Sequence, residues 1–247
     1  MFDVVSLFHA APDSPVQVVK GAYELLRPLA QWLGAKDPLL SQWYLGGKSL
    51  TEAEQYQAFV DEVNGHTACL AVLEAQNKKN VGEIGVFIWN GQNSPDTGAS
   101  LSILMSSGPF TSDLTLSLGG DPAKPRIGDY KDTAEFLMMM VRATRPECSF
   151  VYDRAGYGNR RTFKDRPGVG WMLYLPRTFT TQELPEARAL LPVLEGKERL
   201  GTIIVSVTDA VFDDNNPEHL EIARDIETRL VSNDWLPTWA QMTKPVT

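Results

Sequence analysis

The sequence predicts an α+β fold, with one domain over residues 1–247 in which helices pack against a mixed, mainly antiparallel sheet. Apolar residues recur at helical spacing in a helical N-terminal part, about residues 1–80. They alternate at strand spacing in much of a sheet-rich part, about residues 81–237. Turn-forming residues separate the alternating runs, as in antiparallel meanders, and no repeat or linker divides the sequence.

Helical signals dominate the first part. Ser14 and Pro15 form a cap and first-turn pair, and the apolar spacing behind them predicts a helix from about 15 to 33, kinked at Pro28. A second helix is predicted from the capping-box spacing of Ser49 and Glu52. Its expected inner face and end consist of Tyr56, Phe59, Val60 and Val63, followed by Asn64 and Gly65. Residues 67–76 fit a helix or a buried strand, and their composition favours a helix.

The sequence after residue 80 predicts strands. Three alternating runs indicate an antiparallel meander, at residues 84–88, 101–105 and 114–118. Further strands are expected at residues 150–152, 169–175 and 202–207. The last of these is apolar at nearly every position, which is typical of a central strand.

Two helices are expected within and after this strand-rich part. Asp132 is the expected cap of the first, whose buried stripe consists of Phe136, Leu137, Met140 and Val141. The second has Asn216 at the cap position, Pro217 at the first helical position, and Pro237 as its expected end. Its inner face is predicted from Ile222, Ala223, Ile226 and Leu230, with Arg229 near the negative end of the helix dipole.

Composition limits the classes of function. A net charge of −8 argues against a dedicated nucleic-acid binder and suits a basic partner. Cys69 and Cys148 have no disulfide or metal-ligand spacing, so we expect buried free thiols in a reducing compartment. The sequence contains no apolar run of 18 residues and no secretory signal pattern. These features predict a cytoplasmic protein without membrane contact.

Recognised catalytic and cofactor motifs are missing from the sequence. Lys48 and Ser49 follow a glycine as in a phosphate-binding loop, but Gln42 occupies the place of its first glycine. None of the histidines, His9, His66 and His219, has a second metal ligand at local spacing. For His219, at the start of the last helix, we expect a solvated or locally hydrogen-bonded side chain. The sequence therefore predicts no catalytic residue, metal or cofactor.

Two charged segments are candidate contact sites. The acidic turn after the expected strand at 202–207 contains Asp209, Asp213, Asp214 and Glu218. Turn formation and the helix dipole explain these acids without a ligand, although a hard cation is an alternative. The arginine loop at 154–166 contains Arg154, Tyr157, Arg160, Arg161, Phe163 and Arg166. Its composition favours a partner surface, with a solvated loop paired to nearby acids as the alternative.

Several segments of the sequence resemble the immunity protein 52 family. The C-terminal ones are GVGWMLYLPRTFTTQELPEARALLPVL (168–194) and GTIIVSVTDAVFDDNNPEHLEIARDIETRLVSNDWLP (201–237). The N-terminal ones are ELLRPLAQWLGAKDPLLSQWYLGG (24–47) and SLTEAEQYQAFV (49–60). The resemblance implies a cytoplasmic antidote, without catalytic residues, to a toxin delivered by a type VI secretion system. It also implies that the toxin is a nuclease with a restriction-endonuclease-like fold.

Two modes of inhibition fit the charged segments. In the first, the acids of the turn mimic DNA phosphates and occupy a basic cleft of the toxin. In the second, the arginine loop engages the acidic metal ligands of a nuclease site. Obstruction through another surface, such as the N-terminal helices, stays open. The alternative functions are a metal-dependent hydrolase that uses Asp209, Asp213 and Asp214, or an adaptor of the secretion system.

Overall fold

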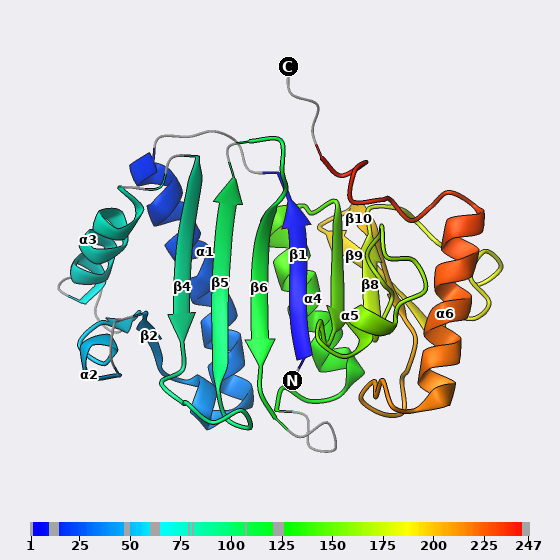
Figure 1. Cartoon of the computed structure of the whole chain (residues 1–247), viewed down its shortest axis with the longest axis horizontal. Coiled ribbons are helices and arrows are strands. Elements are labelled where there is room, and N and C mark those ends of the chain that lie inside the picture. The colour runs from blue at the N-terminus through cyan, green and yellow to red at the C-terminus, as the bar shows by residue number, and fades with distance from the viewer. Residues whose placement is uncertain are drawn as a thin grey trace.

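One sheet of ten strands forms the centre of the computed structural model (Figure 1). The structure describes residues 2–9, 15–46, 50–59, 65–78, 80, 82–106, 108–120 and 126–243. The strand order is β3-β2-β4-β5-β6-β1-β7-β8-β10-β9, and all neighbouring strands are antiparallel. A single isolated bridge, between Val151 and Gly170, is parallel among the described residues. The predicted α+β class is therefore confirmed.

The elements have these bounds. The strands are β1 (Phe2–Phe8), β2 (Trp43–Leu45), β3 (Gln57–Ala58), β4 (Glu83–Trp89), β5 (Ala99–Ser106), β6 (Ser112–Leu118), β7 (Cys148–Tyr152), β8 (Met172–Leu175), β9 (Ala189–Glu195) and β10 (Glu198–Val205). The helices are α1 (Pro15–Lys36), α2 (Leu50–Ala53), α3 (Gly65–Asn77), α4 (Tyr130–Thr144), α5 (Tyr157–Arg160) and α6 (Pro217–Ser232), with a short 3-10 helix at Pro38–Leu40.

The two faces of the sheet build two separate cores. Successive residues of a strand point to opposite faces, so Val4 of β1 joins the core under α1 and α4, and Val5 joins the core under α6. Figure 1 shows α1 and α4 behind the sheet and α6 at its right-hand end. On the front, α6 and α5 cover the β7–β8–β10 half, whereas no described helix lies over β4, β5 and β6 (Figure 1).

Most strand predictions hold. The meander of β4, β5 and β6 is confirmed, with Val86 opposite Ile103 and Ile103 opposite Leu114. The strand expected at 202–207 is β10, but it lies second from the edge rather than at the centre. It is apolar because both of its faces are covered: Ile203 belongs to one core and Ile204 to the other.

Three other strand features differ from the expectations. Strand β1, at the centre of the sheet, and the edge strand β9 were not predicted. The strand expected at 169–175 begins later, at Met172, because Gly170 has a left-handed φ of 52°. A side chain at Gly170 would put its Cβ 2.5 Å from the Cβ of Tyr152, so the chain bends there before β8 begins.

The helix predictions need corrections at their boundaries. The second predicted helix is wrong: α2 covers four residues, and β3 then pairs with β2. Phe59 has a left-handed φ of 66°, its amide donates to the Tyr23 hydroxyl, and the two rings lie 4.8 Å apart, so the chain turns here. Gly65 begins α3, which confirms the helical reading of 67–76. Ser14, Ser49, Val60, Val63 and Asn64 lie outside the described residues.

Two helix ends also move. The cap of α4 is Asp129, whose side chain accepts from the amides of Lys131 and Asp132, while Asp132 completes the capping box from inside the helix. The cap of α6 is Asn216 with Pro217 at the first position, as predicted. This helix ends at Ser232, five residues before Pro237, so the proline does not terminate it.

Candidate functional site

The acidic turn connects β10 to α6. Its backbone is held locally: the Asp213 amide donates to His219 Nδ1 at 3.0 Å, and the Asn215 amide donates to Asp213 Oδ1 at 2.9 Å. Asn216 then caps the helix through the Glu218 amide. The predicted local hydrogen bond of His219 is thereby confirmed. These hydrogen bonds fix the backbone around Asp213, and the side chains of Asp209 and Asp213 are both exposed.

Two adjoining hollows open beside this turn. The larger, of about 700 Å³, lies between the turn and the start of α4. It is lined by Asp129, Tyr130, Trp171, Thr208, Asp209, Ala210, Val211, Asp213, Asn216 and His219. The smaller, of about 250 Å³, is lined by Arg188, Ser206, Val207, Thr208, Asp209, Glu218, His219 and Ile222. Both hollows are bordered by Thr208, Asp209 and His219. The two hollows therefore form one acid-lined groove, with Asp209 at their junction.

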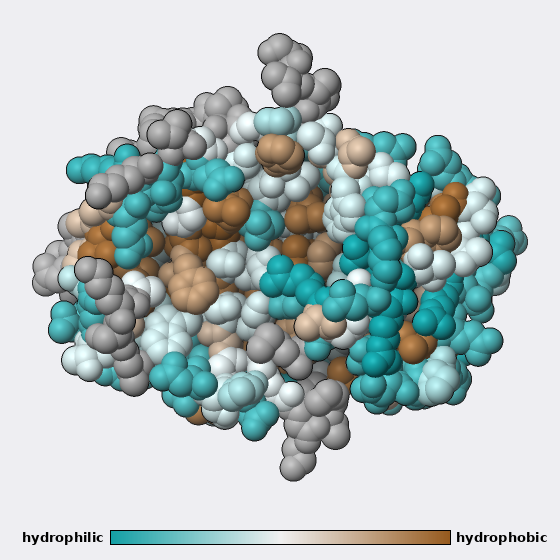
Figure 2. Space-filling model, in the orientation of Figure 1, coloured by the Kyte–Doolittle hydropathy of each residue, from teal (hydrophilic) through white to brown (hydrophobic). Residues whose placement is uncertain are grey.

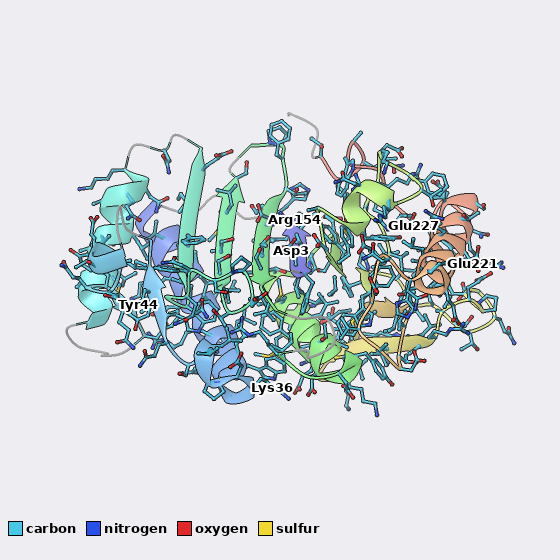
Figure 3. All side chains as sticks on the ribbon, turned by 60° about the horizontal axis from the view of Figure 1, so that its bottom comes forward. Asp3, Lys36, Tyr44, Arg154, Glu221 and Glu227 are labelled. Carbon is cyan, nitrogen blue, oxygen red and sulfur yellow. The ribbon has the colours of Figure 1, made fainter. Side chains whose placement is uncertain are left out.

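A buried carboxylate on α6 organises the arginine loop. Glu227 is 1% exposed and accepts three hydrogen bonds. The donors are the Tyr157 hydroxyl, the Thr162 amide at 3.0 Å and the Val169 amide at 3.0 Å. Figure 3 places Glu227 on α6 below the short helix α5. Sequence reasoning missed this residue, although its spacing from Ala223 and Leu230 puts it on the buried face of α6.

Tyr157, expected at a partner surface, lies in the interior of the protein. Its side chain is fully buried, and its ring contacts Tyr152 and Phe212 at centroid distances of 5.3 and 5.2 Å. Burial, and next the negative charge of Glu227, raise the pKa of Tyr157 far above its ordinary value. The hydroxyl therefore stays protonated and acts as a hydrogen-bond donor to Glu227.

Arg161 and Arg166, two of the four arginines of the loop, donate to backbone carbonyls. Arg161 donates to the carbonyls of Gly158, Lys164 and Phe163 at 2.8, 3.1 and 3.2 Å. Arg166 donates to the carbonyl of Leu236 and lies 3.6 Å from the Asp165 carboxylate. The Phe163 side chain is partly buried. Arg161 thus uses three of its donors within the loop, whereas Arg166 donates one hydrogen bond and its buried Nε has no hydrogen-bond partner among the described residues.

The remaining two arginines lie apart from each other and are exposed. Arg154 leaves the loop and binds Asp3 on the central strand β1, with Nε 3.0 Å from Oδ2 (Figure 3). Arg160 donates to the carbonyl of Asp214 and lies 3.6 Å from its carboxylate. The structure thus joins the arginine loop to the acidic turn, which are far apart in the sequence.

This contact divides the acids into paired and free ones. Asp214 pairs with Arg160, and Glu218 lies 3.9 Å from Arg188. Neither Asp209 nor Asp213 forms an ion pair with any residue that the structure describes. Of the acidic turn, Asp209 and Asp213 therefore present uncompensated carboxylates to the groove.

The described residues contain no group of three or more histidines, cysteines, aspartates or glutamates that could hold a metal ion. Within the same residues, no helix combines the length and the apolar character that crossing a membrane needs. Cys69 and Cys148 are free and buried, as expected. Burial raises the pKa of both thiols, that of Cys148 to about 12.

The chain resembles known proteins in its fold and in its family pattern. It is similar to the solved structure of the Pseudomonas aeruginosa T6SS protein PA0821, with a TM-score of 0.50 and 13% sequence identity. That likeness covers 90% of this chain and 73% of the other, and it shows a shared fold. No curated protein matches the chain. The family model of immunity protein 52 matches residues 17–237. The chain therefore belongs to the immunity protein 52 family, as a non-enzymatic inhibitor that binds and neutralises a cognate toxin.

Proposed function

We propose that the toxin is a DNA-cleaving enzyme and that this protein occupies its DNA-binding cleft with the acidic turn that borders the groove. The observation that carries this proposal is the pair of uncompensated carboxylates, Asp209 and Asp213, beside a hollow of about 700 Å³. DNA-binding clefts are basic because they neutralise phosphates. Two carboxylates on a fixed turn can take the place of two phosphates in such a cleft.

The contacts of the arginine loop favour this mode over the insertion of arginines into a nuclease site. Arg161 donates to three backbone carbonyls, Arg166 donates to one and is half-buried, and Arg160 is paired with Asp214. Releasing any of them would leave local acceptors unsatisfied, at a cost of about 1–3 kcal/mol per buried group. Their role in the proposed complex is to hold the acidic turn in place.

The proposed site of action is the cytoplasm, where DNA is exposed to an incoming nuclease. Two buried free thiols suit a reducing compartment. The family resemblance supports delivery of the toxin by a type VI secretion system. A preformed turn suits rapid capture, because charge complementarity steers encounter and a fixed surface lowers the ordering cost of binding.

The test uses two charge-matched double variants. Asp209→Asn with Asp213→Asn removes the free carboxylates, and Glu221→Gln with Asp225→Asn removes two exposed charges from the outer face of α6. We expect the first pair to weaken toxin binding at least 30-fold in calorimetry and to restore DNA cleavage in a nicking assay. The control pair should stay within threefold of the unaltered protein.

Two results would contradict the proposal in different ways. If both double variants bound the toxin with equal affinity, the groove would not be part of the interface. A purified toxin that leaves DNA intact, and is nevertheless bound, would reject the DNase while keeping the antidote function. The slope of affinity against salt should be shallower for the Asp209 and Asp213 variant, since two charge contacts are lost.

A further inference from the structure

The front face of β4, β5 and β6 is a second candidate interaction surface, separate from the groove. The cross-strand register sets its residues in rows. One row runs from Gly85 through Leu104 and Asp113 to Leu7, and the next contains Phe87. The backs of the same strands belong to the core under α1, with Val86, Ile103 and Leu114 buried. The front is the face that no described helix covers (Figure 1).

This open face carries a large part of the exposed apolar surface. Phe87 is 47% exposed and Leu104 is 40% exposed on this face. Figure 2 shows hydrophobic surface gathered over β4 and β5 on this side. Two glycines leave these side chains accessible to a partner. Gly46 lies beside Phe87 and Gly85 lies beside Leu104, and neither glycine places a side chain over its neighbour. Clustered apolar side chains of this kind mark interaction sites.

A carboxylate lies within this apolar row. Asp113 stands directly across from Leu104 on one side and Leu7 on the other. Its side chain accepts a hydrogen bond from the Thr115 hydroxyl at 3.1 Å and forms no ion pair with a described residue. Burial raises the pKa of Asp113, opposed by that hydrogen bond and by the charge of Arg154. The carboxylate is thus partly desolvated, and the cation that acts on it, Arg154, is itself paired with Asp3.

We propose that the toxin seats an apolar patch on Phe87 and Leu104 and places a lysine or arginine side chain against Asp113. This inference rests on the toxin binding of the proposed function but does not require the toxin to be a nuclease. A basic residue fits because it supplies the counter-charge that the apolar row lacks. The net charge of −8 adds long-range attraction for a basic partner.

The same charge argues against a second copy of this chain on the open face. In a two-fold dimer the same patch meets itself, so two Asp113 carboxylates would approach each other in an apolar interface. Pairing of like charges there would cost free energy instead of offsetting the desolvation. A basic toxin surface would pair with Asp113 and avoid this repulsion. The cognate toxin is therefore the proposed partner.

The test compares matched exposed leucines. Leu104 lies on the open face and Leu194, 44% exposed, lies on the edge strand β9. We expect Leu104→Asp to weaken toxin binding at least 30-fold in calorimetry, and Leu194→Asp to change it less than threefold. Phe87→Ala, which adds no charge, should weaken binding about tenfold. Thermal unfolding of each variant checks that the fold is kept.

A second pair tests the carboxylate. Asp113→Asn should weaken binding about tenfold, whereas Asp225→Asn on the outer face of α6 should leave it unchanged. Unaltered binding by both Leu104→Asp and Phe87→Ala would overturn the inference, as would a self-associated protein that Leu104→Asp turns into monomers. Loss of binding in the Asp209 and Asp213 variant alone would support the groove and reject the open face. A toxin that does not cut DNA would reject the proposed nuclease activity. The comparisons of the Leu104, Phe87 and Asp113 variants would still test the open face.

Discussion

Replacing Glu227 by alanine tests whether the arginine loop is held from α6. The carboxylate accepts from Tyr157, Thr162 and Val169, and hydrogen bonds to a charged group are worth about 1.5–3 kcal/mol each. The three together would contribute about 4–9 kcal/mol, but removing the carboxylate also relieves its desolvation, which costs several kcal/mol. We therefore expect the free energy of unfolding to fall by about 3 kcal/mol.

Urea unfolding followed by circular dichroism measures this change. Glu221→Ala is the matched control, because Glu221 lies on the same helix with an exposed side chain (Figure 3). It should alter the free energy by less than about 0.5 kcal/mol. Glu227→Gln should lose less than the alanine variant, since one acceptor oxygen is kept while the new amide group faces a backbone donor. A loss below about 1 kcal/mol for Glu227→Ala would refute the reasoning.

Three further changes test other parts of the fold. Gly170→Ala should cost about 2–4 kcal/mol in urea unfolding, because its φ is left-handed and the new Cβ would lie 2.5 Å from the Cβ of Tyr152; a neutral result would contradict the turn. Asn216→Ala should cost about 1 kcal/mol through loss of the α6 cap, and Asn216→Asp should restore it. The hydrogen bond to Arg229 lowers the pKa of Glu186, so this pair stabilises the protein above the ordinary glutamate pKa and loses its effect as the pH falls through the lowered value. Glu186→Gln should therefore be less stable than the unaltered protein at pH 7, with the gap closing in acid; a gap that is constant with pH would count against it.

The fold could be predicted where local pattern and tertiary environment agree. The meander of β4, β5 and β6 alternates because one face packs on α1 and the other is open. Helix α6 was predictable from Asn216 and Pro217, whose roles depend only on neighbouring backbone. The sequence of β1 does not alternate, since Val4 and Val5 enter different cores, and Pro192 obscured the edge strand β9.

The candidate site was predictable in its parts but not in its assembly. The acidic turn and the arginine loop are recognisable as charged segments, yet the contact between Arg160 and Asp214 follows from the placement of β7, β8 and β10 side by side. No local pattern shows that placement. Helical spacing places Glu227 on the buried face of α6. Glutamates are rarely buried, however, and its burial is explained only by the three hydrogen-bond donors that the folded structure brings to it.

The central position of β1 has a consequence for how the chain folds as it is synthesised. Strand β1 pairs with β6 and with β7. Its backbone hydrogen bonds therefore form only with residues that are distant in the sequence, as in the pairs of Phe2 with Leu118 and Asp3 with Tyr152. The segment from Asp3 to Tyr152 has to be synthesised before β1 has both of its neighbours, and such distant pairing slows folding. The two halves of the sheet, one with the open face and one with the groove, are therefore joined only by this slow pairing.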